Sequence, residues 1–364
     1  MRVLRIINSL TMGGAERSIV SNVPLHIQNG IEMDVLVLDG TEFIFFKKLK
    51  EQNINIISLA NINVYNPLII FKLRKIITDY DIVHAHLFPS LYLLAIANWI
   101  NKKKVKLVYT EHSTHNRRRK IKLFKHIDKI IYKQYDAIIT ISNATNLALN
   151  DYLKNTLKKG RKIINISNGV DLNSVKKEAS KEKKFDFEKI KNSKIILQIS
   201  GFRPAKDQDT LIRALKNLPT EFHVIFVGDG ERINLCKQLA LQMGVSSRVW
   251  FLGEQENVGA IINKADLVVM SSHWEGFGRA AIEGMALGKP VLASDVSGLR
   301  DIVFGAGILF APGNTKQLSE LILKLLTDEK LYRQISECCL KRASEYDIAN
   351  MINDYEQVYC NVLE

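Results

Sequence analysis

Residues 271–295 read SSHWEGFGRAAIEGMALGKPVLASD, and the order of elements in this stretch predicts the fold. An apolar run, Leu267–Met270, comes directly before it, and a second, Pro290–Ala293, lies near its end. Between them are a Gly-rich turn and a helical stretch that includes Glu283–Leu287. Two parallel strands need a helical crossover to return the chain, so this order predicts a parallel β-α-β unit.

Similar short runs, rich in Val and Ile, recur along the whole chain between longer amphipathic stretches. They are apolar on both faces, which fits parallel strands covered by helices on both sides. The rhythm restarts in the second half, so we expect an α/β chain of two tandem Rossmann-like, doubly wound domains. The expected strands are Val3–Ile7, Asp34–Leu38, Ile54–Leu59, Asp81–His86, Lys106–Thr110, Ala137–Ile141, Lys162–Ile166, Ile195–Ile199, His223–Val227, Val249–Leu252, Leu267–Met270, Pro290–Ala293 and Gly307–Phe310.

The connection between the two sets of strands, Ser174–Asn192, is rich in Lys and Glu and lacks a strong apolar stripe, so it is interpreted as a solvated linker. We therefore predict an N-terminal domain of residues 1–172 and a C-terminal domain of residues 173–346. A last helix, about residues 347–364, has an apolar stripe that must dock on another element. The stripe consists of Ile348, Met351, Ile352, Tyr355, Val358 and Tyr359.

The chain of 364 residues carries 51 Lys and Arg against 38 Asp and Glu, a net charge of +13. Hydrophobic residues make up 46% of it, which excludes a disordered or collagen-like chain. The four cysteines show no paired spacing, so we expect no disulfide framework, no zinc site and a reducing compartment. The sequence contains no run of about 18 apolar residues, so we predict no membrane-spanning helix.

The whole charge excess lies in residues 1–172, and most of it lies in residues 101–133, which hold 12 Lys and Arg against Glu111 and Asp128. A helix is expected from about Arg119 to Lys133. This patch is either the solvated rim of a packed helix or a surface that docks on anionic lipid, and we favour lipid. No nucleic-acid-binding motif accompanies it. Its candidate contact residues are Lys102, Lys103, Lys104, Arg117, Arg118, Arg119 and Lys120.

The Gly-rich turn of the opening stretch also carries candidate chemistry. Glu275 precedes the turn Gly276-Phe277-Gly278, and Glu283 follows eight positions later. A Gly turn at a helix N-terminus bares backbone N–H groups and suits a phosphate. The two carboxylates could bind hydroxyls on either side of that phosphate, as a nucleotide sugar would require. A plain strand–turn–helix with two surface acids explains the spacing equally well.

The segment resembles the signature of glycosyltransferase family 4, whose members have the GT-B fold and transfer a sugar with retention of anomeric configuration. The resemblance implies two domains that face each other across a cleft, with the last helix crossing back to the first domain. It further implies that Glu275 contacts the donor sugar and Glu283 the ribose. The turn residues implied to face the diphosphate and sugar are Gly276, Phe277, Gly278 and Arg279.

Further segments fall in the family's order and cover nearly the whole chain. Gly13 and Gly14 match a loop over the donor phosphates, and His112 matches an active-site histidine at a strand end. Lys206 matches a lysine that binds the diphosphate. The family's second cation, five residues earlier, is replaced here by Gly201, so Arg203 is taken to supply that charge.

Three other patterns receive a more ordinary interpretation. Gly228, in a Gly-Asp-Gly turn, is a turn residue that also matches a family position near the base. His84 and His86 are interpreted as structural, since no acidic partner stands at metal-ligand spacing. Asp207-Gln208-Asp209 imitates a metal-binding DxD motif, but it precedes a helix and is interpreted as a cap. No metal and no cofactor are expected.

The resemblance therefore implies a metal-independent, retaining glycosyltransferase. UDP is the expected nucleotide, with GDP as an alternative, and the expected acceptor is a lipid-linked glycan of a bacterial surface polysaccharide or glycoconjugate. The enzyme would be cytoplasmic and peripheral on the inner face of the cell membrane. A nucleotide-sugar epimerase of the same architecture remains an alternative, as does a basic nucleic-acid-binding protein, which would leave Glu275, Glu283 and Lys206 unexplained.

Overall fold

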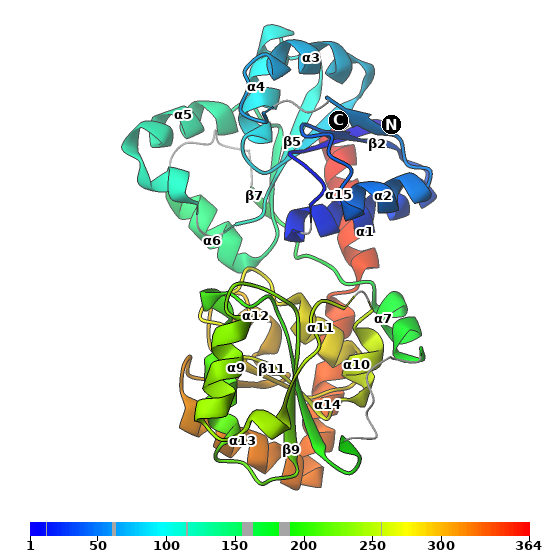
Figure 1. The fold of residues 1–364 in the computed structure, drawn as a ribbon. Helices are drawn as coiled ribbons and strands as arrows, with labels where there is room; N and C mark the ends of the chain where they lie inside the picture. The colour runs from blue at the N-terminus through cyan, green and yellow to red at the C-terminus, as the bar shows by residue number, and fades with distance from the viewer. Residues whose placement is uncertain (12, 60–62, 114–115, 155–162, 182–189, 256) are drawn as a thin grey trace. The chain divides into compact units, whose positions relative to one another are not determined.

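The structure is a computed structural model, which describes residues 1–364 except 12, 60–62, 114–115, 155–162, 182–189 and 256 (Figure 1). The chain forms two compact units. The amino-terminal unit comprises Met1–Asn168 and Ile348–Glu364, and the carboxy-terminal unit comprises Gly169–Asp347. The sequence-based boundary at residue 172 lies four residues beyond the observed one.

The amino-terminal unit contains a seven-stranded parallel sheet with the order β3-β2-β1-β4-β5-β6-β7. Strand β1 lies at its centre and pairs with both β2 and β4, so that Val3 is aligned with Met33 on one side and with Ile82 on the other. The strands are β1 (Arg2–Ile7), β2 (Glu32–Val37), β3 (Ile56–Ser58), β4 (Ile82–His86), β5 (Lys106–Glu111), β6 (Ala137–Thr140) and β7 (Ile163–Asn165).

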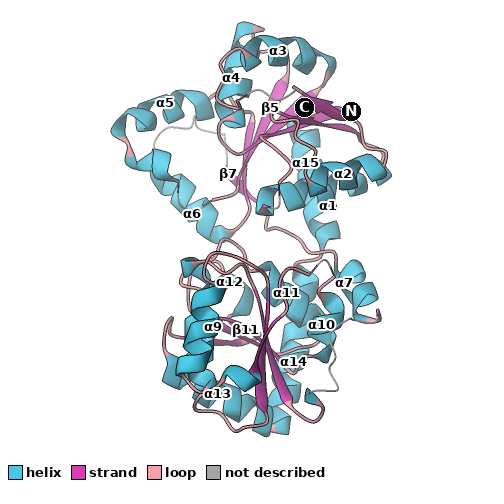
Figure 2. Cartoon of the chain, in the orientation of Figure 1, coloured by secondary structure: helices cyan, strands magenta, loops and turns pink. Residues whose placement is uncertain are grey.

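Helices cover both faces of this sheet (Figure 2). Alternate residues of β1 enter two separate cores, Val3 and Ile7 on one face and Leu4 and Ile6 on the other, as the period of a strand requires. The helices are α1 (Gly14–Gln28), α2 (Ile44–Glu51), α3 (Ile69–Ile76), α4 (Ser90–Ile100), α5 (Lys122–Tyr132), α6 (Asn143–Tyr152) and α15 (Ile348–Leu363).

The carboxy-terminal unit repeats this plan with a six-stranded parallel sheet of order β10-β9-β8-β11-β12-β13. In each sheet the strand order reverses beside the unit's first strand, at β1/β4 and at β8/β11, and such a switch point opens a crevice at the carboxyl ends of the strands. The strands are β8 (Lys194–Ile199), β9 (Phe222–Val227), β10 (Val249–Phe251), β11 (Leu267–Met270), β12 (Val291–Ser294) and β13 (Ile308–Phe310).

The helices of this unit also lie on both sides of its sheet (Figure 2). They are α7 (Leu172–Ala179), α8 (Gln208–Leu215), α9 (Ile233–Gln242), α10 (Gly259–Lys264), α11 (Arg279–Ala286), α12 (Arg300–Val303), α13 (Thr315–Thr327) and α14 (Glu329–Glu345).

Every expected strand is present, which confirms the α/β class with two Rossmann-like units. The apolar stripe of the last helix is buried: α15 packs into the same core as α1, and the two helices lie side by side in Figure 1. No helix among the described residues is long and apolar enough to span a membrane.

The prediction of a solvated linker at Ser174–Asn192 is wrong in its first part. The helix α7 begins before it, at Leu172, and buries Leu172 and Val175 in the core of the carboxy-terminal unit. These two side chains are three positions apart and therefore share a helical face. A segment that starts at Ser174 includes only Val175, so its apolar face is not recognisable. Residues 182–189 of the predicted linker lie outside the described residues.

Candidate functional site

The central feature of the carboxy-terminal unit is an ion pair between Lys206 Nζ and Glu275 Oε2. Lys206 follows β8 and Glu275 follows β11, the two adjacent strands at the switch point of the sheet. Both side chains are mostly buried, with 22% and 14% of their surfaces exposed. The residues that the family resemblance assigns to the diphosphate and to the sugar are thus in direct contact.

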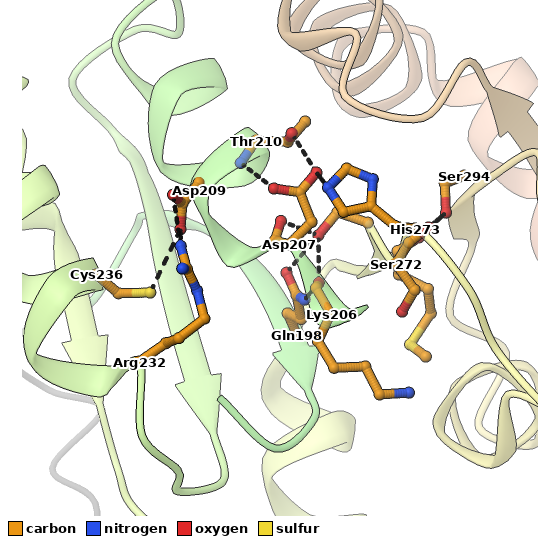
Figure 3. Close-up of polar contacts among 12 residues, drawn as sticks. Gln198, Lys206, Asp207, Asp209, Thr210, Arg232, Cys236, Ser272, His273 and Ser294 are labelled. Atoms are coloured by element: carbon orange, nitrogen blue, oxygen red, sulfur yellow. Dashed lines mark hydrogen bonds and ion pairs between the residues drawn. The ribbon is translucent and has the colours of Figure 1, made fainter. Parts of the chain in front are cut away.

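The turn that carries Lys206 is held by buried polar side chains (Figure 3). Gln198 Nε2 and Ser271 Oγ both donate to the Lys206 carbonyl, at 3.0 and 3.2 Å. Asp207 has a φ of 44° and caps α8, since its carboxylate accepts hydrogen bonds from Thr210 N at 3.4 Å and from Thr210 Oγ1 at 2.6 Å. In Figure 3 the Lys206 side chain points away from the Asp207 cap. The hydrogen bonds to the Lys206 carbonyl fix the backbone from which this side chain extends.

The interpretation of Asp207-Gln208-Asp209 as a helix start is correct for Asp207. Asp209 has a different partner, because Arg232 Nη2 donates to both of its carboxylate oxygens at 2.9 and 2.8 Å (Figure 3). Among the described residues, no group of three or more His, Cys, Asp or Glu side chains could hold a metal ion.

Gly201, which stands where the family has a cation, lies beside Arg203. A Cβ added at Gly201 would be 3.9 Å from Arg203 Nε, so this guanidinium occupies the space beside the missing side chain. Arg203 is exposed, and its role at the diphosphate stays a prediction.

The Gly-rich turn after β11 ends at Gly278, whose φ of 81° places it in the left-handed region, and α11 begins at Arg279. The first N–H groups of a helix have no acceptor within the helix, so this turn presents donors to an anion. The loop is fixed by a second glycine: Gly298 has a φ of 91°, and a Cβ there would lie 2.4 Å from the Glu275 carbonyl oxygen.

Glu283 is buried one turn inside α11, and its Oε1 accepts a hydrogen bond from Arg279 Nε at 2.7 Å. Phe277 is also buried, against the core of the unit, so the turn offers its backbone and not this ring. Gly228 is required by the protein itself, because a Cβ there would lie 2.2 Å from the Ser200 carbonyl oxygen. Its turn closes onto the loop that leads to Lys206.

In the amino-terminal unit, Gly13 is the N-cap residue of α1 and Gly14 is its first residue. The carboxylate of Glu16 folds over Gly13, where an added Cβ would lie 2.1 Å from Glu16 Oε2. Glu16 stands in the first turn of α1, and burial raises the pKa of its carboxyl.

His112 directly follows β5, at the carboxyl end of the sheet. Its Nε2 lies 2.9 Å from His86 Nδ1, and the two rings are tilted with centroids 5.2 Å apart. Burial, with a smaller contribution from Arg5, lowers the pKa of His112 to about 3. His84 is fully buried and bonded through both ring nitrogens, as expected for a structural histidine. The pairing of His86 with His112 was not foreseen.

Two members of the predicted basic patch are not at the surface, which corrects the prediction for them. Arg118 is 7% exposed, and its Nε lies 3.2 Å from Asp128 Oδ2. Arg119 forms an ion pair with Glu111. The two acids of the window are therefore the partners of these arginines.

The other predicted residues of the patch are either exposed or have side chains that the structure does not describe. Lys102, Lys103 and Lys104 are exposed in the turn before β5. Arg117 and Lys120 lie in a single 3-10 turn, and their side chains lie outside what the structure describes. The expected helix therefore starts at Lys122 and not at Arg119.

The helix α5 and the residue before it expose apolar side chains among cations. Ile121, Leu123 and Ile130 are 51%, 67% and 63% exposed, and Lys122 and Lys125 are exposed beside them. These side chains form one surface that we call the α5 surface, defined by Ile121, Lys122, Leu123, Lys125 and Ile130.

Two family models match the chain. The model described as Glycosyltransferase Family 4 matches residues 12–174, and the model described as Glycosyl transferases group 1 matches residues 179–341. Each model thus covers most of one structural unit.

Similar curated proteins include N-acetyl-alpha-D-glucosaminyl L-malate synthase of Bacillus anthracis, which is 26% identical over 297 residues, covering 78% of this chain and 76% of that protein. The serotype-specific mannosyltransferase WbdA of Escherichia coli is 25% identical over 233 residues, 60% of this chain and 28% of that protein.

Among solved structures, Anabaena HepE in complex with UDP superposes with a TM-score of 0.86 at 23% identity, covering 99% of this chain and 100% of that one. A glycosyltransferase from Rickettsia africae gives a TM-score of 0.84 at 23% identity, covering 100% of this chain and 98% of that one. At this identity the superpositions show the fold, and the family models with the related sequences show the class: the chain is a glycosyltransferase of the family 4 type with the GT-B fold.

Proposed function

We propose that the protein transfers a hexosyl or N-acetylhexosaminyl group from a UDP-linked donor, with retention of anomeric configuration and without a metal ion. The observation that carries this proposal is the contact between Lys206 and Glu275 at the carboxyl ends of β8 and β11. A cation for a diphosphate and a carboxylate for sugar hydroxyls stand side by side at the switch point, where α/β sheets bind ligands.

The nucleotide assignment is supported by neighbours of the same fold. HepE structures contain UDP and UDP-glucose, whereas WbdA is a mannosyltransferase by name and the Bacillus anthracis relative is named for an N-acetylglucosaminyl product. Because these sugars differ, the donor proposed here is a class and not a single compound. GDP-mannose is the alternative that a donor screen should include.

The proposed chemistry uses few protein groups. As the sugar leaves, negative charge builds on the leaving phosphate, and Lys206 with Arg203 would stabilise it together with the N–H groups of the Gly276–Arg279 turn. Such cations make a metal unnecessary for charge neutralisation. Glu275 would hold the sugar hydroxyls, and Glu283 the ribose. The acceptor hydroxyl would attack on the face from which the phosphate leaves, with that phosphate taking the proton.

The proposed acceptor is a lipid-linked glycan, used at the surface of an anionic membrane in polysaccharide synthesis. The α5 surface supports this part, because exposed Leu123 and Ile130 beside Lys122 and Lys125 combine apolar and cationic groups as interfacial helices do. Each cation near an anionic bilayer contributes about 1 kcal/mol. The revised docking surface thus includes α5, in place of the buried Arg118 and Arg119.

The experiment is a donor and acceptor screen with radiolabelled UDP-glucose, UDP-N-acetylglucosamine and GDP-mannose and with polyprenyl-diphosphate-linked sugars. Label should enter the lipid fraction, and the anomeric configuration of the new bond should match that of the donor. Label that stays on the nucleotide while the sugar changes identity would identify an epimerase and reject the proposal. A product of inverted configuration would reject retention.

A further inference from the structure

A buried arginine in the amino-terminal unit takes no part in the proposed chemistry, and its hydrogen-bond partners are a histidine and a tyrosine. Arg5 lies at the centre of β1 with no exposed surface, between Val3 and Ile7 on the same face of the sheet. Among the residues that the structure describes, no carboxylate forms an ion pair with Arg5. A buried cation without a paired acid is costly, so the contacts that it does make deserve an explanation.

Arg5 can only donate hydrogen bonds, and this property fixes the proton positions of its neighbours. Its Nη2 lies 3.0 Å from His26 Nε2 and 3.0 Å from the Tyr359 hydroxyl. His26 must therefore accept at Nε2 and carry its proton on Nδ1. That nitrogen lies 2.9 Å from Glu356 Oε1, so the carboxylate compensates the charge of Arg5 through the imidazole ring.

The same reasoning extends from Tyr359 toward the strand ends. The Tyr359 oxygen accepts from Arg5 and keeps its own proton, which can be donated to His84 Nδ1, 2.7 Å away. His84 then carries its proton on Nε2 and donates to Thr110 Oγ1 at 2.8 Å. A second proton on His84 would break this chain, because both ring nitrogens are already used.

His84 also contacts the histidine pair formed by His86 and His112. Its ring stacks on His86 with centroids 4.3 Å apart, and His86 Nδ1 lies 2.9 Å from His112 Nε2. The Nε2 of His86 is buried without a hydrogen-bond partner. Protonation there would bury an N–H group that nothing in the described part of the chain accepts, which disfavours a charged His86.

We propose that Arg5 is a positioning residue of the His112 site: its buried guanidinium keeps His84 and His86 uncharged and in fixed tautomers, and thereby holds His112 as a neutral hydrogen-bonding group. The role of His112 in transfer rests on the proposed function, but the protonation states do not.

The electrostatics of the cluster agree with this geometry. Burial, followed by the charge of Arg5, lowers the pKa of His26 to about 2 and the pKa of His84 well below its usual value. Burial also lowers the pKa of His86, with His84, His112 and Arg5 as smaller contributors. A neutral imidazole near a sugar can accept a proton or a hydrogen bond, whereas a charged one would repel the positive charge that builds on the sugar ring.

The other charged groups on the elements that pack against the histidines do not change the protonation states described above. On β5, Glu111 is paired with Arg119. On α15, Glu356 faces His26, while Tyr355 places its ring 5.3 Å from the Arg5 guanidinium. Burial raises the pKa of Tyr355, and it raises that of Tyr359 to about 12, so both remain neutral. Arg5 thus contacts His26 directly, and its charge also lowers the pKa of His84, of His112 and, as the smallest contribution, of His86.

The test is a pH titration of the imidazole nitrogens by NMR, with protein labelled on its eight histidines and the spectrum of His112→Gln used to assign the His112 signals. In the wild type, His84 should show the Nε2–H tautomer, His26 the Nδ1–H tautomer, and His112 no protonation above pH 5. Opposite tautomers, or a His112 midpoint near the usual 6.5, would overturn the proposal.

The variants Arg5→Met and Arg5→Lys form a matched pair, because Met keeps the length of the side chain and Lys also keeps its charge. In Arg5→Met, the protonation midpoint of His112 should rise from about 3 by about one pH unit, because the charge of Arg5 is lost while the burial of the ring remains. Arg5→Lys should behave as the wild type. A folded Arg5→Met, with unchanged UDP affinity in the other unit, whose His112 midpoint equals that of the wild type would overturn the proposal.

Tyr359→Phe supplies a second variant if Arg5→Met does not fold. It removes the hydroxyl between Arg5 and His84 but keeps the guanidinium, so His84 should lose its single tautomer while His112 stays neutral. Retention of a single Nε2–H tautomer at His84 would contradict the proposed chain of hydrogen bonds from Arg5 through Tyr359 to His84. With a donor in hand, the fall of kcat/KM at acid pH should begin about one pH unit higher for Arg5→Met than for the wild type.

Discussion

Lys206 Nζ and Glu275 Oε2 form an ion pair between the loops that follow two adjacent strands of the same sheet. In the proposed donor complex each group has another partner, Lys206 a diphosphate oxygen and Glu275 a sugar hydroxyl. The pair keeps both side chains aimed at one point before the donor arrives, which lowers the cost of ordering them on binding.

Replacing either partner should separate nucleotide binding from transfer. Lys206→Met removes the cation for the diphosphate, so UDP affinity should fall about tenfold or more, and transfer should fall by about 100-fold or more. Glu275→Gln keeps the shape but removes the charge, so it should lower transfer similarly while UDP affinity stays within about threefold. Calorimetric titration with UDP and initial transfer rates measure the two effects. Equal losses of UDP affinity in both variants would contradict the division of roles.

The guanidinium of Arg203 should be replaceable by a cation at position 201. Arg203→Ala should weaken UDP binding about tenfold, because it removes one charge from the diphosphate site. Gly201 has no left-handed φ, and a Cβ there would meet the Asp229 carbonyl oxygen only at 3.5 Å, so Gly201→Lys is sterically acceptable. The double variant should therefore recover most of the lost affinity. Unchanged UDP affinity in Arg203→Ala alone would show that Arg203 does not contact the nucleotide.

The backbone approach between Gly298 and Glu275 predicts a specific effect on catalysis. Gly298→Ala would place a methyl group 2.4 Å from the Glu275 carbonyl oxygen and must displace the loop, so transfer should fall by about 100-fold, as small misplacements near the chemistry do. Gly313→Ala is the matched control, since its φ is also left-handed, at 74°, with no atom within 4 Å of the added Cβ. Its strain should cost about 1 kcal/mol of stability and leave transfer near the wild-type rate. Similar transfer rates in both variants would refute the assignment.

Membrane association should depend on the α5 surface. Leu123→Ser with Ile130→Ser should reduce binding to vesicles of phosphatidylglycerol by about tenfold or more at low salt, while UDP affinity stays unchanged. Leu241 is 67% exposed in the other unit, so Leu241→Ser serves as the control and should bind vesicles normally. Co-sedimentation measures both. Normal vesicle binding by the double variant would reject the docking surface.

The buried arginine of the same region should behave as a structural residue. Arg118→Ala removes the cation beside the buried Asp128, and breaking a buried pair on one side costs about 3–5 kcal/mol. The melting temperature should therefore fall by several degrees. A melting temperature equal to that of the wild type, together with weaker vesicle binding, would restore Arg118 to the lipid-binding surface.

The buried histidines predict how stability depends on pH. The folded-state pKa of His26 is about 2, below its unfolded value near 6.5, and those of His84 and His86 are also lowered. The unfolded chain therefore binds more protons below about pH 6.5, so stability is complete above that pH and falls as the pH decreases toward the folded values. Urea unfolding between pH 7 and 5 should show this decline, and Arg5→Met should show a shallower one. A stability that rises toward pH 5 would contradict the neutral cluster.

Much of the fold follows from the sequence because parallel strands that are buried on both faces leave a clear apolar pattern. The positions of Gly278 and Lys206 at strand ends follow from the same pattern. The ion pair of Lys206 with Glu275 could not be predicted, since it depends on how two loops 69 positions apart converge. The burial of Arg118 and Arg119 was missed because net charge in a window does not reveal which acids lie within reach.

The Arg5 network shows a different limit. An Arg between apolar residues in a strand, as in Val3–Ile7, signals an unusual core position, but its partners come from α1 and α15. The sequence gives no register between β1 and a helix more than 300 residues away. Only the folded unit shows that the proton positions of His26 and His84 depend on one guanidinium.

The most direct test of the account is the initial rate at which label from a saturating UDP-sugar enters a lipid-linked acceptor, compared between the wild type and Glu275→Gln. The account predicts steady transfer by the wild type and a rate lower by about 100-fold or more in the variant, with UDP affinity retained. Transfer by Glu275→Gln at the wild-type rate, from any donor that the wild type uses, would contradict it.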